Sequence, residues 1–386
     1  MKRIPEGAGK LLLLAFIFYL NFLSRIIISP LLPEVKEELA LSASQASGMF
    51  LALSLGYFSA LLGSGFLSAR LGHKKSILMS VFLASACLLT IAISNSLYVL
   101  YAGFLSLGLA TGLYLPSGIA TITSLFEKAF WGRAFSVHEL APNLAFITAP
   151  AVASFFLGRS SWHLLMAILA GMTLFTGVVF FRIDAGNFKG TAPNLASCSY
   201  YLKKSEFWLM AILFGLGITS TLGIYNMLPL YLVTAHSMSN ADANMLVSLS
   251  RIATLATALT GGVLSDKYGP AKVMGWMLFV TGLLTAALGM LHGVMLDICV
   301  FLQPLLAVCF FPAAFAAISE MSSPGERNLL ISMVVPFAFL GGGGIMPWII
   351  GIFADHGLFA QAFVVTGLVL ASGLFLARTI HGTTET

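Results

Sequence analysis

Charge is scarce in this chain. Of its 386 residues only 9% are Asp, Glu, Lys or Arg, whereas 58% are hydrophobic, and the mean hydropathy is +0.95. A soluble domain has about 25% charged and about 45–50% apolar residues. This composition excludes a water-soluble globular protein, because such a protein lacks the interior to bury so much apolar surface. We therefore predict a protein whose solvent is the lipid bilayer.

The motifs of several enzyme classes are missing as well. There is no G-x-x-x-x-G-K-[ST] phosphate loop, no H-E-x-x-H zinc motif and no G-x-S-x-G nucleophile motif. The cysteines are scattered, without the C-x-x-C spacing of a metal site or the pattern of a disulfide framework; they are Cys87, Cys198, Cys299 and Cys309. We expect no enzymatic activity, no metal and no cofactor. The absence of an N-x-[ST] sequon favours a prokaryotic protein of the cytoplasmic (inner) membrane.

What the sequence does contain is a series of long apolar runs. A membrane-spanning helix needs about 20 apolar residues. Twelve runs satisfy this, near residues 11–33, 45–69, 75–94, 97–124, 134–157, 163–182, 207–233, 243–265, 271–291, 294–319, 328–354 and 358–379. The one long polar connection, residues 183–206, lies at mid-chain. We predict an all-α membrane protein with twelve transmembrane helices.

The basic residues orient these helices. If the N-terminus is inside, sixteen of the 20 Lys and Arg residues fall on the cytoplasmic side, including Lys2, Arg3 and Arg327, and only Lys36 and Arg159 fall outside. Cytoplasmic loops of membrane proteins carry such an excess of Lys and Arg. Both termini are therefore expected in the cytoplasm, and the net charge of +5 needs no nucleic-acid partner.

The two halves of the chain resemble each other at an offset of about 196 residues. The loop Gly65-Phe66-Leu67-Ser68-Ala69-Arg70-Leu71-Gly72 after the second span matches Gly262-Val263-Leu264-Ser265-Asp266-Lys267-Tyr268-Gly269 after the eighth. Other matches keep the same order; they are Pro33 with Pro229, Pro116 with Pro312, Pro150 with Pro347, and Gly171 with Gly367. We predict two six-helix bundles, residues 1–182 and 207–386, joined by a cytoplasmic linker of residues 183–206.

This loop motif in a six-plus-six chain resembles the major facilitator superfamily. The resemblance implies the major facilitator fold, which consists of two pseudo-symmetric bundles around a central solute site, and transport by alternating access. It also implies a cytoplasmic gate at the two loops, formed by Gly65, Arg70 and Gly72 in the first and by Asp266, Lys267 and Gly269 in the second. The first loop departs from the pattern because Ala69 replaces the usual acid, so the gate is expected to be asymmetric.

Two arginines are predicted inside the membrane. Arg25 lies in the first span and Arg251 in the eighth, each about eight residues, or about 12 Å, from the outer end. A buried charge is costly in the membrane, so each needs a reason. Arginine stays charged and binds carboxylate or phosphate bidentately, which favours an anionic solute. The alternatives are snorkelling, bonds to backbone carbonyls, or ion pairs with Asp242 or Asp297.

Neutral polar residues are expected beside the arginines. Asn21 precedes Arg25 by one helical turn. The resemblance places the first, fourth, seventh and tenth spans around the cavity, which adds Tyr114, Tyr225, Asn226 and Gln303 as candidate solute-binding residues.

His138 and Glu139 lie near the cytoplasmic end of the fifth span. Glu139 is a candidate for proton coupling, and the alternative is a gate ion pair with Arg70 or Arg133.

Together these features predict a secondary transporter, expected to act as a monomer, for a small organic anion, coupled to protons or exchanging anions. An arginine in the first or eighth span resembles the organic-anion branches of the superfamily, such as anion:cation symporters and monocarboxylate carriers. An alternative is a drug or amphiphile exporter of the same fold, and a further one is a membrane sensor or enzyme.

Overall fold

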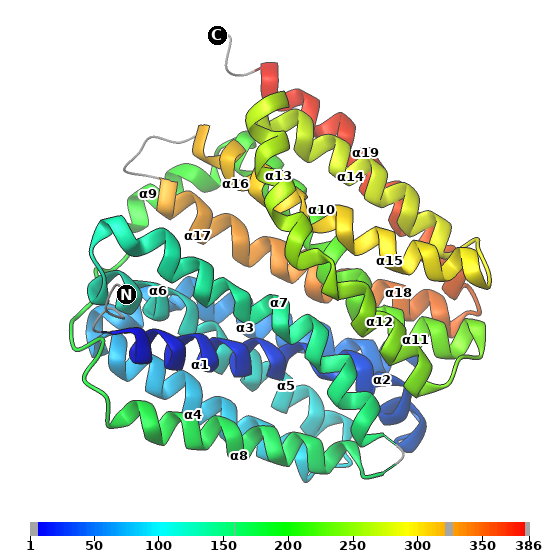
Figure 1. Ribbon diagram of the computed structural model, residues 1–386, viewed down its shortest axis with the longest axis horizontal. Coiled ribbons are helices and arrows are strands. Elements are labelled where there is room, and N and C mark those ends of the chain that lie inside the picture. The colour runs from blue at the N-terminus through cyan, green and yellow to red at the C-terminus, as the bar shows by residue number, and fades with distance from the viewer. Residues whose placement is uncertain (1–6, 158, 321–326, 383–386) are drawn as a thin grey trace, which may run out of the picture. The chain divides into compact units, whose positions relative to one another are not determined.

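The computed structural model describes residues 7–157, 159–320 and 327–382, and in this part of the chain every regular element is a helix (Figure 1). Lys2 and Arg3 of the charge count lie outside the described residues, as does the side chain of Arg327. Among the described residues, eleven helices are long and apolar enough to cross a membrane, and the bent pair Asn240–Thr257 and Thr260–Tyr268 brings the number to as many as twelve. The expected spans are confirmed to within a few residues at most ends.

The helices form two compact units. The first unit contains Met1–Ile28 and Ala52–Pro193, and the second contains Ser29–Leu51 and Asn194–Thr386. Elements of the first unit are α1 (Ala8–Ile26), most of α3 (Ala43–Leu71), α4 (His73–Ala92), α5 (Leu97–Gly112), α6 (Tyr114–Leu125), η1 (Lys128–Phe130), α7 (Trp131–Phe156) and α8 (Trp162–Phe181).

Elements of the second unit are α2 (Ile28–Glu38), the start of α3, α9 (Leu195–Leu202), α10 (Ser205–Ile218), η2 (Thr219–Gly223), α11 (Ile224–His236), α12 (Asn240–Ile252), α13 (Thr254–Tyr268), α14 (Pro270–Leu288), α15 (Val294–Val308), α16 (Phe310–Glu320), α17 (Arg327–Ala338), η3 (Phe339–Ile345), α18 (Met346–Asp355), α19 (Phe359–Arg378) and η4 (Thr379–Gly382). The elements η2 and η3 are π-helical, and η1 and η4 are 3₁₀ turns.

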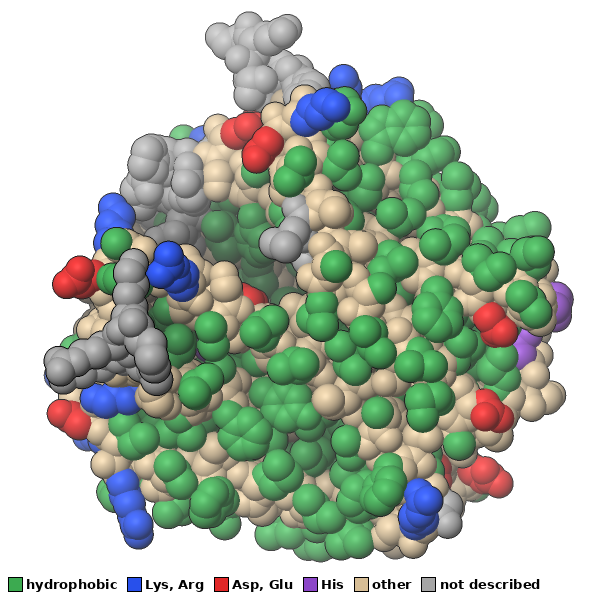
Figure 2. All heavy atoms as spheres, in the orientation of Figure 1, with side chains coloured by type: hydrophobic (Ala, Val, Ile, Leu, Met, Phe, Trp, Pro, Cys, Tyr) green, Lys and Arg blue, Asp and Glu red, His purple; other side chains and the backbone are tan. Residues whose placement is uncertain are grey.

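Each unit has its own apolar core. In the first, Leu14, Phe18 and Tyr114 belong to a cluster between α1, α4, α6 and α7. In the second, Met210, Phe214 and other buried residues pack α10 against α14, α16, α17 and α19. Large apolar side chains also cover the outer surface, such as those of Phe175, Val263 and Phe375. Figure 2 shows hydrophobic side chains over most of the visible face, which suits helices that contact lipid.

The helix breaks repeat at the offset found in the sequence. The fourth span breaks at Leu113 between α5 and α6, and the tenth breaks at Cys309 between α15 and α16. The first span breaks at Ile27, and η2 interrupts the seventh at the matching place. Gly72 and Gly269, which precede α4 and α14, share positive φ values of 90° and 88°. This backbone conformation favours glycine, and it explains why both loops carry one there.

The second unit takes in the end of the first span and the start of the second. Asp355, at the end of α18, accepts hydrogen bonds from the backbone N–H groups of Ala43 (2.6 Å) and Ser44 (3.1 Å) and from the hydroxyl of Ser42 (2.9 Å). Ser42 and Gln45 form a capping box, in which each side chain accepts the other residue's N–H. The first turn of α3 is therefore capped partly from within and partly by α18, 311–313 residues away.

Candidate functional site

Arg25 is buried near the end of α1, with 6% of its surface exposed. Its guanidinium carbon lies 4.7 Å from the centre of the Phe22 ring and 4.2 Å from the centre of the Tyr57 ring of α3. A side-chain hydrogen bond with Tyr57 adds to this contact. Aromatic rings attract a cation through their faces. The stacking makes the buried charge less costly and fixes the plane of the guanidinium.

Arg251 is buried in the second unit, near the end of α12, with 2% of its surface exposed. Its guanidinium carbon lies 5.0 Å from the centre of the Tyr225 ring of α11, and Nη2 donates to the carbonyl of Thr221 at 3.4 Å. One of the predicted alternatives, a bond to a backbone carbonyl at a helix break, is therefore present. Asp242, another alternative partner, accepts a hydrogen bond from the Ser239 hydroxyl, and Ser239 caps α12 by accepting the N–H of Asp242.

The predicted residues Arg251 and Gln303 both contact the π-helical segment Thr219–Gly223. Gln303 of α15 donates from Nε2 to the carbonyl of Ser220 at 2.6 Å, next to the carbonyl that Arg251 contacts. In a π-helical turn each carbonyl accepts from the N–H five residues on instead of four, and such turns occur often at functional sites. Side chains from α12 and α15 supply donors here.

A second π-helical segment, Phe339–Ile345, packs on the first through glycine. A Cβ atom on Gly223 would lie 2.5 Å from the carbonyl oxygen of Gly342, and one on Gly342 would lie 2.5 Å from Gly215 O and Thr219 N. Asn226 donates from Nδ2 to Gly343 O at 3.2 Å, while its buried Oδ1 has no hydrogen-bond partner among the described residues. Asn226 thus presents an acceptor that a solute donor or water can satisfy.

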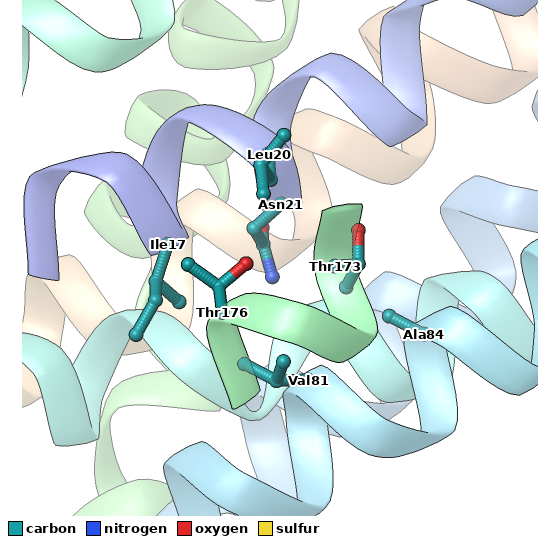
Figure 3. A pocket seen from close by; sticks show the side chains of 7 residues that line it. All are labelled: Ile17, Leu20, Asn21, Val81, Ala84, Thr173 and Thr176. Carbon is teal, nitrogen blue, oxygen red and sulfur yellow. The ribbon is translucent and has the colours of Figure 1, made fainter. Parts of the chain in front are cut away.

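Asn21 makes its hydrogen bond to the fourth span. Its Nδ2 donates to Thr111 O of α5 at 3.0 Å. It also lines a small pocket between α1, α4 and α8, whose other lining residues are Ile17, Leu20, Val81, Ala84, Thr173 and Thr176. Figure 3 shows its amide reaching toward Thr173 and Thr176 of α8. Asn21 therefore ties the first span to the fourth within the unit.

Tyr114 and His138 form a buried pair in the first unit. The Tyr114 hydroxyl donates to Leu14 O at 2.6 Å and lies 3.1 Å from Nε2 of His138. His138 is fully covered, and its ring stacks on Phe18 at 4.3 Å. Nδ1 of His138 lies 3.4 Å from Oε1 of Glu139, whose side chain is 58% exposed. The structure thus joins three predicted residues.

The two predicted gate loops are built differently. In the first, the linker covers the start of α4, because the N–H groups of His73 and Lys74 donate to Phe188 O (3.0 Å) and Gly186 O (2.9 Å). A Cβ atom on Gly65 would lie 2.8 Å from Pro193, so the linker also lies close to that end of α3. Arg70 is exposed.

In the second loop, Pro270 follows Gly269 as the first residue of α14, and Asp266 and Lys267 are exposed. Pro has no N–H to satisfy at that position.

Sequence reasoning missed the aromatic partners of the arginines. Tyr57 carries no pattern signal, since it is 32 positions from Arg25 and one of ten tyrosines. The π-helical segments were missed for a similar reason, although the run Gly341–Gly344 permits the close approach. The capping box Ser42-Ala43-Ser44-Gln45 was a readable signal, and it marks the start of α3.

Residues 14–239 and 207–385 match the sequence model described as Major Facilitator Superfamily. A comparison with curated proteins gave no match.

Solved structures with this fold cover nearly the whole chain. A bacterial homologue of the human lysosomal transporter Spinster, in an inward-facing and occupied conformation, aligns with a TM-score of 0.83 at 15% identity, covering 98% of both chains. A variant of the nucleoside transporter NupG aligns with a TM-score of 0.80 at 15% identity, covering 96% of this chain and 99% of that one. A D-xylose–proton symporter aligns at 0.77 with 14% identity, covering 97% of each chain. At these identities the likeness shows the fold.

Proposed function

Because the chain belongs to the Major Facilitator Superfamily and is a membrane transporter rather than an enzyme, we propose that its solute is a small organic anion, a carboxylate or a phosphorylated metabolite. Transport is driven by proton symport or by exchange for another anion. Structures with this fold include peptide, sugar and nucleoside carriers. Support for an anion comes from this chain's own residues.

The observation that carries the proposal is one buried, ring-stacked arginine in each unit. Arg25 and Arg251 are 6% and 2% exposed, inside helices that cross the membrane. An aromatic ring lowers the cost of burying a guanidinium but leaves its net charge in place. An anionic solute supplies the countercharge. A guanidinium that stacks through its face can bind a carboxylate or phosphate bidentately through its edge.

Neutral residues of α11, the helix that carries the ring partner of Arg251, fit the same role. Asn226 Oδ1 is a buried acceptor, and the Tyr225 ring lies against the guanidinium. These groups suit the hydroxyl or amide donors of an organic anion, whereas the arginine takes the charge.

We further propose that residues 1–182 and 207–386 act as the two moving bundles of a monomer, joined by the linker 183–206, with both termini in the cytoplasm of a prokaryotic inner membrane. The distribution of Lys and Arg supports this orientation. The loops with Gly65, Arg70 and Gly72, and with Asp266, Lys267 and Gly269, then form the cytoplasmic gate. Glu139 and His138 are the proposed proton-coupling groups, and the alternative for Glu139 is a gate pair with Arg70 or Arg133.

Counterflow in proteoliposomes tests the solute class. Liposomes preloaded with unlabelled organic anion should accumulate the labelled anion when they contain the wild-type protein. Arg25→Gln and Arg251→Gln should each lower the rate about 10- to 100-fold, because each loses charge-assisted hydrogen bonds to the anion. Arg159→Gln is the matched control, since Arg159 also lies over a ring, that of Phe155 at 4.8 Å, but is exposed.

The proposal fails if both buried-arginine variants, folded and inserted at wild-type levels, exchange anions at the wild-type rate. Transport of lipophilic cations that survives both substitutions would instead identify an amphiphile exporter. A protein that shows no counterflow with any solute would point to a sensor.

A further inference from the structure

Hydrogen bonds around Tyr114 fix the tautomer of His138. The 2.6 Å contact between the Tyr114 hydroxyl and Leu14 O requires the hydroxyl to donate, because a carbonyl only accepts. The hydroxyl oxygen is then the acceptor for Nε2 of His138 at 3.1 Å, so Nε2 carries a hydrogen. In a neutral imidazole the other nitrogen, Nδ1, is consequently an acceptor.

This acceptor faces a second acceptor. Nδ1 of His138 lies 3.4 Å from Oε1 of Glu139 and has no hydrogen-bond donor among the described residues. A neutral histidine in this tautomer and an ionised glutamate would turn two lone pairs toward each other, whereas one added proton turns the repulsion into a charge-assisted hydrogen bond. We propose that the His138–Glu139 pair is a proton-binding site that holds one shared proton in this conformation.

The other charged groups of the helices around His138 are engaged elsewhere and do not replace Glu139 as the partner of Nδ1. His138 packs against α1 and α6. The charged residues of α1 are Lys10, which donates to Asp184 O, and Arg25, which stacks on Phe22 and Tyr57. In α6 the titratable group is Tyr114, which donates to Leu14 O. On α7 itself the other charged residue is Arg133, which lies over Phe130. Glu139 is the acid next to His138, and its exposure gives the shared proton a way in and out.

A run of rings connects this proton site to Arg25. His138 stacks on Phe18, Phe18 meets Phe22 edge-on at 6.5 Å, and Phe22 lies under the Arg25 guanidinium. Movement of the His138 ring on losing its proton would therefore shift the packing that holds Arg25. This link to transport rests on the anion function proposed above, whereas the proton site itself does not.

The proton site is tested on purified protein without solute, by following the melting temperature between about pH 5 and about pH 8. If the folded protein holds this shared proton, the melting temperature of the wild type should fall as the pH rises, by about 2–4 °C for the loss of one ordinary interaction. Glu139→Gln should remove this dependence, because the amide N–H₂ donates permanently to Nδ1. His138→Asn should remove it by deleting the ring.

Tyr114→Phe gives the sharpest test, because it leaves both titratable groups in place. Without the tyrosine oxygen, Nε2 no longer has to carry hydrogen, and a neutral His138 can point Nδ1–H at Glu139. The pH dependence should then weaken. His356→Asn is the control and should leave it unchanged, since His356 is exposed and bonds only within its own turn, to Ile352 O.

Transport separates the two proposals. Glu139→Gln should retain anion counterflow but lose stimulation of uptake by a pH gradient. If the melting temperatures of Glu139→Gln, His138→Asn and Tyr114→Phe all follow pH as the wild type does, the proton site is wrong. If the melting data agree but no anion is exchanged, the proton site stands and the anion function is wrong.

Discussion

The two units use the same parts in opposite places. In the first unit the arginine is on the first span and its tyrosine, Tyr57, is on the second; in the second unit the tyrosine, Tyr225, is on the first of the matching spans and Arg251 is on the next. The amide bonds are exchanged too. Asn21 donates from the first span to the fourth, whereas Gln303 donates from the tenth span to the seventh. The two units therefore contain the same kinds of interaction, but the spans that carry the two partners are exchanged.

Each unit also has features without a counterpart in the other. His138 and Glu139 have no titratable counterpart, because the residues 196 positions later are Val334 and Val335. Conversely, the second unit has π-helical segments in spans 7 and 11 that the first lacks in the described residues. Gly342, which contacts η2, corresponds at this offset to Phe146 in the first unit. Phe146 packs edge-on against Phe22 at 5.2 Å. The proposed proton site thus lies in the first unit, and the contact between two π-helical segments lies in the second.

Among the predictions made here, the largest effect on stability is expected where the two π-helical segments approach each other. Gly342→Ala would place a Cβ atom 2.5 Å from both Gly215 O and Thr219 N, so the two π-helical segments must separate. Overpacking of this kind costs about 1–3 kcal/mol. A lower melting temperature in detergent, together with slower counterflow, measures it.

Gly341→Ala controls for helix propensity in the same segment, because a Cβ atom there meets nothing within 4 Å. It should be neutral or slightly stabilising. If Gly342→Ala has the same melting temperature as Gly341→Ala, the contact between the π-helical segments does not distinguish the second unit from the first.

The sequence predicted the spans because apolar length, charge and glycine act locally. The boundary between each proposed gate loop and the helix that follows it was readable from its glycine alone, Gly72 before α4 and Gly269 before α14. The contacts of the site were not readable in this way. Arg25 and Tyr57 meet through the packing of α1 on α3, and Gln303 and Ser220, 83 residues apart, meet through the packing of α15 on η2. Such contacts depend on which helix faces turn inward, and a nearly uniform apolar sequence leaves that undetermined.

A smaller effect is expected at the cap that α18 supplies to α3. Asp355→Ala removes the acceptor of two backbone N–H groups and of the Ser42 hydroxyl. Loss of such a cap costs about 1–2 kcal/mol. Ser42→Ala should cost less, because Asp355 then still accepts from Ala43 and Ser44. Equal melting temperatures for the two variants would show that the capping box, rather than Asp355, stabilises this end of α3.

The smallest effects should come from the exchanged amides, and their equality is the finest test of the comparison. Asn21→Leu and Gln303→Leu each remove a side-chain donor from one buried carbonyl, Thr111 O in the first unit and Ser220 O in the second. Each should cost about 1 kcal/mol, measured as a shift in the melting temperature. Gln303 serves a π-helical carbonyl and also contacts Thr285 at 3.3 Å, whereas Asn21 serves an ordinary helix end. If Gln303→Leu lowers the melting temperature clearly more than Asn21→Leu does, the two amides are not equivalent. The bond from Gln303 to Ser220 O then stabilises the π-helical segment and is not a counterpart of the Asn21 bond.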